Sequence, residues 1–176
     1  FSAPGRADTH TATVDYGEGA GTQSLTLSGF EYYLNNVYED NPPSPATAYT
    51  VEVVVTDDDG GAGSAQLAIT VNNVAPTVDA GLGALLTSGE TYDFSGSFGD
   101  PGVLDAPWDW VITWNDGRTP ATTTGSTSDQ YAAIMASRQV CAAGDYLIDF
   151  DVTDKDGGVG TDDVTISVAY LEIGMI

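Results

Sequence analysis

Cysteine, histidine and basic residues are nearly missing from this chain of 176 residues: Cys141 and His10 are single, and four Lys and Arg stand against 26 Asp and Glu. One cysteine forms neither an internal disulfide nor a paired-cysteine metal site. With so few cationic side chains to neutralise phosphates, nucleic acid and anionic membranes are poor partners. No apolar run approaches the roughly 20 residues that cross a bilayer, and the first residues show no signal-peptide pattern.

The acidic surplus gives a formal net charge of −22. Two carboxylates about 4 Å apart repel by about 4 kcal/mol at an effective dielectric constant of about 20. Such a surface therefore favours bound divalent cations. The alternative is that the charge only provides solubility or adaptation to salt.

An internal repeat organises the chain. The stretch from Tyr49 to Gly61 returns as Tyr146 to Gly158, an offset of 97 positions. Further blocks recur in the same order at the same offset: Leu67–Val71 matches Val164–Val168, and Phe1–Gly5 with Asp8 matches Phe98–Gly102 with Asp105. After one inserted residue, Tyr16–Gly19 matches Trp114–Gly117. Matching blocks in one order indicate two copies of one unit.

Each block alternates apolar and polar residues, which predicts strands with one buried face. Turn residues such as Asn115–Gly117 and Asp156–Gly158 fill the gaps, and no stretch sustains helical periodicity. Short strands at this spacing predict an all-β, immunoglobulin-like sandwich. The strands predicted in the second copy are Thr77–Asp79, Thr91–Phe98, Trp108–Trp114, Pro120–Thr124, Tyr131–Met135, Asp145–Thr153 and Asp162–Ala169.

The two copies differ in completeness. We expect an incomplete sandwich over residues 1–75, a complete one over residues 76–170 and an apolar tail over residues 171–176. The first copy enters at Phe1, the position of Phe98, so it lacks the counterpart of residues 76–97 and with it the first two strands. A sandwich without two strands exposes open edges and half a core. Either the chain is a window of a longer array, or another molecule supplies the missing strands.

The repeated Tyr-x-Val-x-Val-x-Val-Thr-Asp-x-Asp-Gly-Gly strand and turn, preceded by an aromatic-Gly-Asp/Glu-Gly turn, resembles the PKD (polycystic kidney disease) domain. Residues 71–81 resemble the joint between successive PKD repeats of bacterial and archaeal surface proteins. The family's Trp-Gly-Asp-Gly reads Tyr-Gly-Glu-Gly at 16–19 and Trp-Asn-Asp-Gly at 114–117, a departure in turn detail. The resemblance implies tandem immunoglobulin-like sandwiches, an extracellular location, and use as a spacer, adhesive stalk or accessory module of secreted enzymes. Some members bind calcium.

Acidic and amide side chains gather where two loops of such a sandwich meet the entering chain. Calcium takes about six to eight oxygen ligands from flexible loops of this kind, so we predict a calcium site that stiffens the joint between units. The ligand candidates in the second copy are Asp100, Asp105, Asp154 and Asp156, with Asn72 and Asn73 from the linker.

The first copy offers Asp8, Asp57 and Asp59, but Ala3 stands where the second copy has Asp100, so we predict a weaker site there. Neither loop follows the EF-hand pattern, which places Glu at its last ligand position. The alternative is an ordinary turn in which Asp side chains only cap backbone N–H groups.

No residue set favours catalysis, and we expect no enzyme. His10 has Pro107 as its counterpart, which indicates a strand-entry residue rather than a general base. Cys141 has no histidine nearby in the sequence and is expected as a buried or half-buried thiol. Acidic clusters that recur in both copies argue for a structural role, because a catalytic site normally occurs once.

Three tryptophans alternate along one predicted strand. Periodicity places Trp110 and Trp114 in the core and leaves Trp108, at the loop edge, as the candidate for a carbohydrate-stacking surface.

The tail Leu171–Ile176 departs from the repeat and stays apolar. An exposed apolar strand is a liability unless it is paired. One hypothesis is that the tail adds to the incomplete first copy of the next molecule and forms a head-to-tail fibre. The alternative is a processing boundary.

These features predict an extracellular structural or adhesive repeat module, found in a stalk, surface layer or filament. Its expected partners are neighbouring copies or flanking repeats, and beyond them a polysaccharide or cell-surface protein. The alternative is an accessory carbohydrate- or protein-binding module of a secreted hydrolase.

Overall fold

The structure, a computed structural model, describes residues 1–2, 8–119 and 121–170. It divides into two compact units, Phe1–Asn72 and Asn73–Ile176. The described residues form strands, turns and loops without an α-helix, and among them no helix has the length and apolarity to span a membrane. The predicted all-β, immunoglobulin-like fold class is confirmed.

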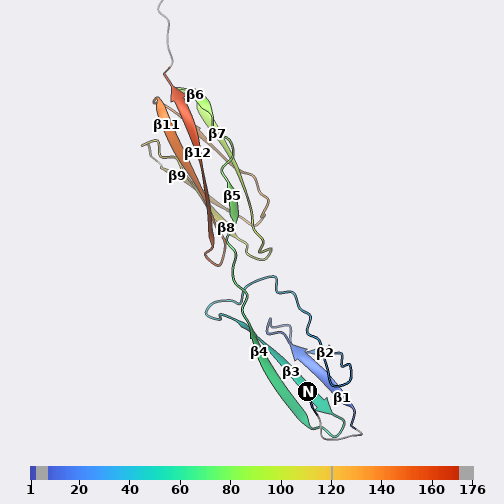
Figure 1. Cartoon of the computed structure of the whole chain (residues 1–176). Coiled ribbons are helices and arrows are strands. Elements are labelled where there is room, and N and C mark those ends of the chain that lie inside the picture. The colour runs from blue at the N-terminus through green and yellow to red at the C-terminus, as the bar shows by residue number, and fades with distance from the viewer. Residues whose placement is uncertain (3–7, 120, 171–176) are drawn as a thin grey trace, which may run out of the picture. The chain divides into compact units, whose positions relative to one another are not determined.

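The described residues of the first unit form one antiparallel sheet with the strand order β2-β1-β3-β4 (Figure 1). Its apolar cluster has three buried members, Val14, Val51 and Val53. The strands are β1 (His10–Asp15), β2 (Gln23–Leu25), β3 (Tyr49–Asp57) and β4 (Ala62–Ile69).

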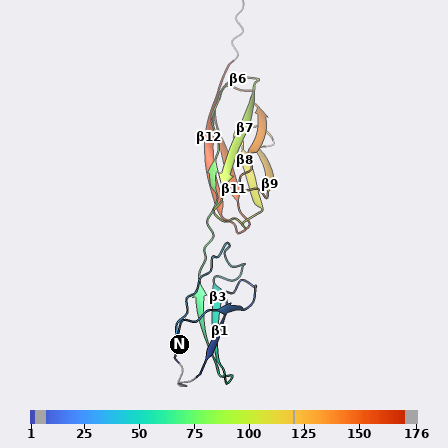
Figure 2. The same cartoon turned by 90° about the vertical axis from the view of Figure 1, so that its right-hand side faces the viewer.

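The second unit contains two sheets, ordered β10-β7-β5 and β6-β12-β11-β8-β9 (Figure 2). Every strand pair is antiparallel except β6 with β12, which is parallel. The strands are β5 (Thr77–Asp79), β6 (Leu85–Thr87), β7 (Thr91–Gly99), β8 (Trp108–Thr113), β9 (Thr122–Thr127), β10 (Ile134–Gln139), β11 (Gly144–Thr153) and β12 (Val159–Ala169).

The apolar residues of alternate strand positions form the core between these two sheets. Phe94 of β7 packs edge-on against Phe150 of β11 with ring centroids 5.2 Å apart, and also meets Trp114 at 6.4 Å. All three side chains are at most 2% exposed. The period-two pattern of the sequence therefore reports the buried face of each sheet.

The chain crosses from one sheet to the other between β5 and β6, where glycines allow a close approach. Gly81 has φ +79°, and a Cβ there would collide with the carbonyl oxygen of Ser95. A Cβ on Gly83 would collide with the carbonyl oxygen of Thr165. A side chain at either position would push the crossing away from the sheets it connects.

Strand pairing repeats between the two units. Val51 pairs with Leu67 in the first unit, and their counterparts Ile148 and Val164 pair in the second. Val53 likewise pairs with Val14, as Phe150 pairs with Ile112. The sequence repeat is therefore also a repeat of strand register.

Three strands of the second unit differ from the prediction. Strand β6 was not predicted, because Leu85–Thr87 is too short to show alternation. Strand β9 lies at Thr122–Thr127 instead of 120–124, since threonine, glycine and serine give it no apolar signal. Strand β10 begins at Ile134 rather than Tyr131: the carboxylate of Asp129 accepts the Tyr131 N–H at 2.9 Å and holds 129–132 as a turn.

An ion pair ties the two sheets of the second unit together. Arg138 of β10 donates from Nε to Asp116 Oδ2 at 2.8 Å and from its terminal nitrogen to Asp116 Oδ1 at 2.6 Å. Asp116 belongs to the turn after β8, and the Arg138 guanidinium lies 5.8 Å from the centroid of the Trp114 ring. The hydrogen bonds from Arg138 lower the pKa of Asp116 below its usual value.

Replacing Asp116 by Asn should destabilise the second unit by about 2 kcal/mol at neutral pH, the order expected for charged hydrogen bonds. Because the folded pKa is lowered, the charged carboxylate stabilises the fold above the ordinary carboxyl pKa. The difference from wild type should shrink as the pH falls through the lowered pKa. Tryptophan fluorescence during urea unfolding measures this unit, which holds all three tryptophans. The exposed Asp109→Asn on β8 is the control for the loss of one carboxylate charge from this unit.

Candidate metal centre

Three buried aspartates converge in the second unit. Asp100 follows β7, Asp105 lies in the loop before β8, and Asp154 follows β11. Their exposed fractions are 6%, 3% and 4%. Each offers a carboxylate oxygen, and these oxygens lie within 4.8 Å of one another. The loops thus bring together the carboxylates of three of the four aspartates named in this copy, and a carboxylate oxygen of the fourth, Asp156, lies within 4.8 Å of one of Asp105.

Asp154 organises the turn between β11 and β12. Its Oδ1 accepts the N–H groups of Asp156 at 2.9 Å and Gly158 at 2.8 Å. Its Oδ2 accepts Nδ2 of Asn73 at 2.8 Å, which fixes the segment that leads into β5. A Cβ on Gly158 would collide with this carboxylate and lie 2.7 Å from Asn73 Nδ2. The second glycine of the repeated turn is therefore required by the close approach of Asp154.

Asp100 is held by the core. Its Oδ2 accepts the indole N–H of Trp108 at 2.8 Å, and its Oδ1 accepts the N–H of Gly102 at 2.8 Å. Trp108 is 1% exposed, so the prediction of an edge tryptophan available for carbohydrate stacking is wrong. Trp114 is buried as expected, and Trp110 is only half-buried. Trp108 is drawn inward because its N–H meets a buried carboxylate.

Asp105 forms an ion pair with Lys155, whose ammonium group is the one cation beside the cluster among the described ion pairs. Lys155 Nζ lies 3.0 Å from Asp105 Oδ1 and 2.9 Å from Asp156 Oδ2. Asp156 therefore binds Lys155, and it is not a member of the triplet formed by Asp100, Asp105 and Asp154. One ammonium against three buried carboxylates leaves negative charge in a poorly hydrated place, which is costly unless further cations are present.

The two linker asparagines behave differently. Asn73 donates from Nδ2 to Asp154, but its Oδ1 is buried and has no hydrogen-bond partner in the described part of the chain. Asn72 is exposed. An unsatisfied amide oxygen on a side chain that contacts the carboxylates is the kind of hard ligand that calcium accepts.

The first unit holds a second acidic group of different composition. Oxygens of Asp8, Asp58 and Asp59 lie within 4.8 Å of one another, and Asp58 and Asp59 are exposed. Asp58, which was not predicted, occupies the position of Lys155 in the repeat. Asp57 instead caps its turn, accepting the Gly61 N–H at 2.6 Å. Ala3 lies outside the described residues.

The two side chains considered for catalysis have no catalytic partners among the described contacts. His10 opens β1, and its ring lies 5.2 Å from Phe1 and 5.8 Å from Phe30. Cys141 is exposed, so the prediction of a buried or half-buried thiol is wrong. It lies in the turn between β10 and β11, where Arg118 donates to its Sγ at 3.2 Å.

No protein-family model matches the sequence, and no curated protein matches it. Solved structures with similar folds include domains 1–6 of the surface layer protein SbsC, with a TM-score of 0.47, 14% identity, 93% of this chain and 20% of that chain covered. The CARDB domain of a Pyrococcus furiosus protein, in complex with di-metal ions, matches with a TM-score of 0.40 and 16% identity. The match covers 56% of this chain and 95% of that chain. The D00-D0 domain of intimin matches with a TM-score of 0.38 and 10% identity. The match covers 90% of this chain and 78% of that chain.

Replacing Trp108 by Phe should lower the free energy of unfolding of the second unit by more than loss of ring volume explains. The variant leaves Asp100 Oδ2 buried without its indole donor, which costs about 1–3 kcal/mol. Trp110→Phe on the same strand is the matched control, because no described hydrogen bond involves its indole. Urea unfolding followed by circular dichroism measures both variants. Equal losses would show that the Trp108–Asp100 bond contributes nothing.

Proposed function

We propose that this chain is a structural or adhesive module of an extracellular surface protein, built from PKD-type repeats, and that its second unit binds calcium through Asp100, Asp105 and Asp154. The observation behind the calcium site is the burial of these three carboxylates within 4.8 Å of one another, with one ammonium beside them. The repeated strand register and the family resemblance support the repeat-module function.

Calcium fits the donors at this site. It prefers carboxylate, amide and backbone carbonyl oxygens at about 2.3–2.6 Å and tolerates irregular geometry. Asp100, Asp105 and Asp154 would supply carboxylate oxygens, and Asn73 Oδ1 is an amide oxygen without another described partner. A soft metal has no ligand here, since the single cysteine, Cys141, lies in the turn between β10 and β11.

The bound ion would fasten three segments that are distant in the sequence: the loop between β7 and β8, the turn after β11 and the residues before β5. Binding to the folded state alone adds about 2.7 kcal/mol of stability at a ligand concentration of about 100 times Kd. A surface module exposed to mechanical load and proteases gains from such cross-linking. Stiffening of the joint between units stays a prediction from the sequence.

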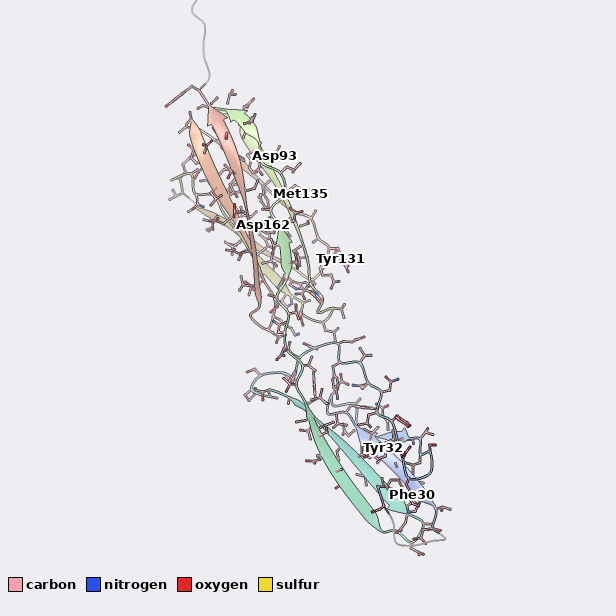
Figure 3. All side chains as sticks on the ribbon, in the orientation of Figure 1. Phe30, Tyr32, Asp93, Tyr131, Met135 and Asp162 are labelled. Carbon is pink, nitrogen blue, oxygen red and sulfur yellow. The ribbon has the colours of Figure 1, made fainter. Side chains whose placement is uncertain are left out.

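The alternative function, an accessory binding module of a secreted hydrolase, depends on exposed aromatic side chains. Trp108 and Trp114 are in the core and do not serve this purpose. Tyr131 is exposed, near Met135 on the outside of the second unit (Figure 3). Tyr170 is exposed as well, and so are Phe30 and Tyr33 in the first unit. The buried carboxylate cluster and the repeated strand register nevertheless favour the structural role. The head-to-tail hypothesis concerns residues 171–176, which lie outside the described residues, and it remains a proposal.

Calcium should raise the unfolding temperature of the second unit, and EDTA should reverse the rise. Asp105→Asn removes one ligand charge at nearly unchanged volume and should abolish most of the shift, whereas the exposed Asp163→Asn on β12 should retain it. Calorimetry measures the temperatures. Terbium luminescence excited through tryptophan reports the same site, because Trp108 contacts Asp100. An equal calcium shift in both variants, or none in the wild type, would contradict the proposed site.

Removing the ammonium of Lys155 should strengthen calcium binding, because this group now neutralises Asp105 at 3.0 Å and competes with the metal ion. We expect Lys155→Met to lower Kd by about tenfold, which corresponds to about 1.4 kcal/mol. Arg118→Met removes the same charge from the same unit away from the site and is the control for general electrostatics. Isothermal titration measures both. Unchanged or weaker binding by Lys155→Met would show that the lysine is not a competitor.

A further inference from the structure

The sheet of the first unit is the structural counterpart of one layer of the second. Its order β2-β1-β3-β4 matches β9-β8-β11-β12, strand for strand and with corresponding registers. In the second unit this layer is covered by the β10-β7-β5 sheet. In the described part of the first unit no second sheet is present. The segment between β2 and β3 contributes an isolated bridge between Ser28 and Glu31, and it packs Tyr32 and Tyr38 against the apolar cluster.

The exposed fractions of equivalent residues in the two units show which part of the first unit's sheet is uncovered. Val164 of β12 is 7% exposed, whereas its counterpart Leu67 of β4 is 53% exposed. Val152 is fully buried, but its counterpart Val55 is only half-buried. The difference lies in the half of the sheet formed by the end of β3 and by β4. Apolar residues that face a core in one copy therefore face solvent in the other.

A groove runs over this same area. It has a volume of about 420 Å³ and is lined by Val53 and Val55 of β3, by Ala65 of β4 and by Tyr32 and His10. Tyr32 lies in the loop that follows β2 (Figure 3). The Nε2 atom of His10 is buried and has no hydrogen-bond partner among the described residues. The groove thus combines an apolar floor with a polar atom suited to a main-chain group.

The outer edge of β4 is also open. In the second unit the end of β12 pairs with β6, with Ser167 opposite Leu85 and Val168 opposite Leu86. The counterparts of Ser167 and Val168 are Thr70 and Val71, which directly follow β4. Within the described residues β4 pairs with β3 alone. An edge strand with free N–H and C=O groups is a template for another strand.

We propose that this face and edge of the first unit bind a β-strand segment of the same repeat type, chemically equivalent to Thr77–Gly99. The second unit shows what such a segment does: β6 pairs with the edge, and β7 lays Tyr92, Phe94 and Phe98 on the sheet. Phe94 contacts Phe150, whose counterpart Val53 lines the groove. The groove is thus the place where a Phe94-like side chain enters. This inference does not depend on the calcium site.

A graft tests the proposal directly. Residues 76–97 are fused in front of Phe1 of the full chain, so that Phe1 follows them as Phe98 does in the second unit. In the second unit the Ser167 N–H donates to the carbonyl oxygen of Ala84. Hydrogen exchange measured by NMR should therefore show the amide of its counterpart, Thr70, protected by about 100-fold or more relative to the ungrafted chain, since a covered edge exchanges only by larger opening. Amides of β11 and β12 provide the internal reference and should not change.

Two variants of the grafted chain make the test specific. Changing the grafted counterparts of Tyr92 and Phe94 to Asp keeps the length but removes the apolar contacts, and it should remove the protection. Ala65→Arg, at an exposed position that lines the groove, should block docking without disturbing the existing core. Equal protection by the intact and the Asp-substituted graft, or no protection by either, would overturn the proposal.

Sedimentation of the ungrafted chain tests whether a second copy of this chain, rather than the proposed strand segment, occupies the face. We expect a monomer with a fast-exchanging Thr70 amide. A dimer whose Thr70 amide is already protected, and whose association is abolished by Ala65→Arg, would show that the face is a homodimer interface and would overturn the proposed occupant.

Discussion

A sheet with one apolar face is stable only when a second layer covers that face, and this requirement governs the whole chain. In the second unit two sheets cover each other's apolar faces and so satisfy this requirement. Their contact buries Phe94, Trp114 and Phe150. In the first unit the strands pair in the same register, but the described layer leaves Leu67 half exposed. Strand pairing and layer packing are thus separable: hydrogen bonds set the register within a sheet, and apolar burial decides whether the sheet is complete.

Local hydrogen bonds explain why the acidic cluster is buried. Asp154 is buried because its turn needs an acceptor for two N–H groups, and Asp100 because Trp108 needs one for its indole. Each carboxylate has its own hydrogen bonds, yet the three carboxylates repel one another because they lie close together. Among the described ion pairs, Lys155 neutralises Asp105. The same carboxylates therefore support a structural turn and form an acidic cluster that could bind a metal ion.

The fold could be predicted from alternation and repetition, because Tyr146–Val152 shows which side of its strand is buried. Short or threonine-rich strands such as β6 and β9 could not, since their place depends on partners distant in the sequence. Asp100, Asp105 and Asp154 were found from loop positions alone. The sequence did not predict that Lys155 would face Asp105, that Asp58 would replace Asp57 in the first unit, or that Trp108 would turn inward, because these depend on side-chain directions.

One turn position distinguishes the two copies: it is Lys155 in the second and Asp58 in the first, each close to the equivalent aspartate, Asp105 or Asp8. An exchange at this single codon reverses a local charge without altering the backbone that surrounds it. Duplicated units can thereby diverge in their demand for external cations while keeping one architecture. If the proposed calcium role holds, units that differ at this position would release their ions at different salt concentrations.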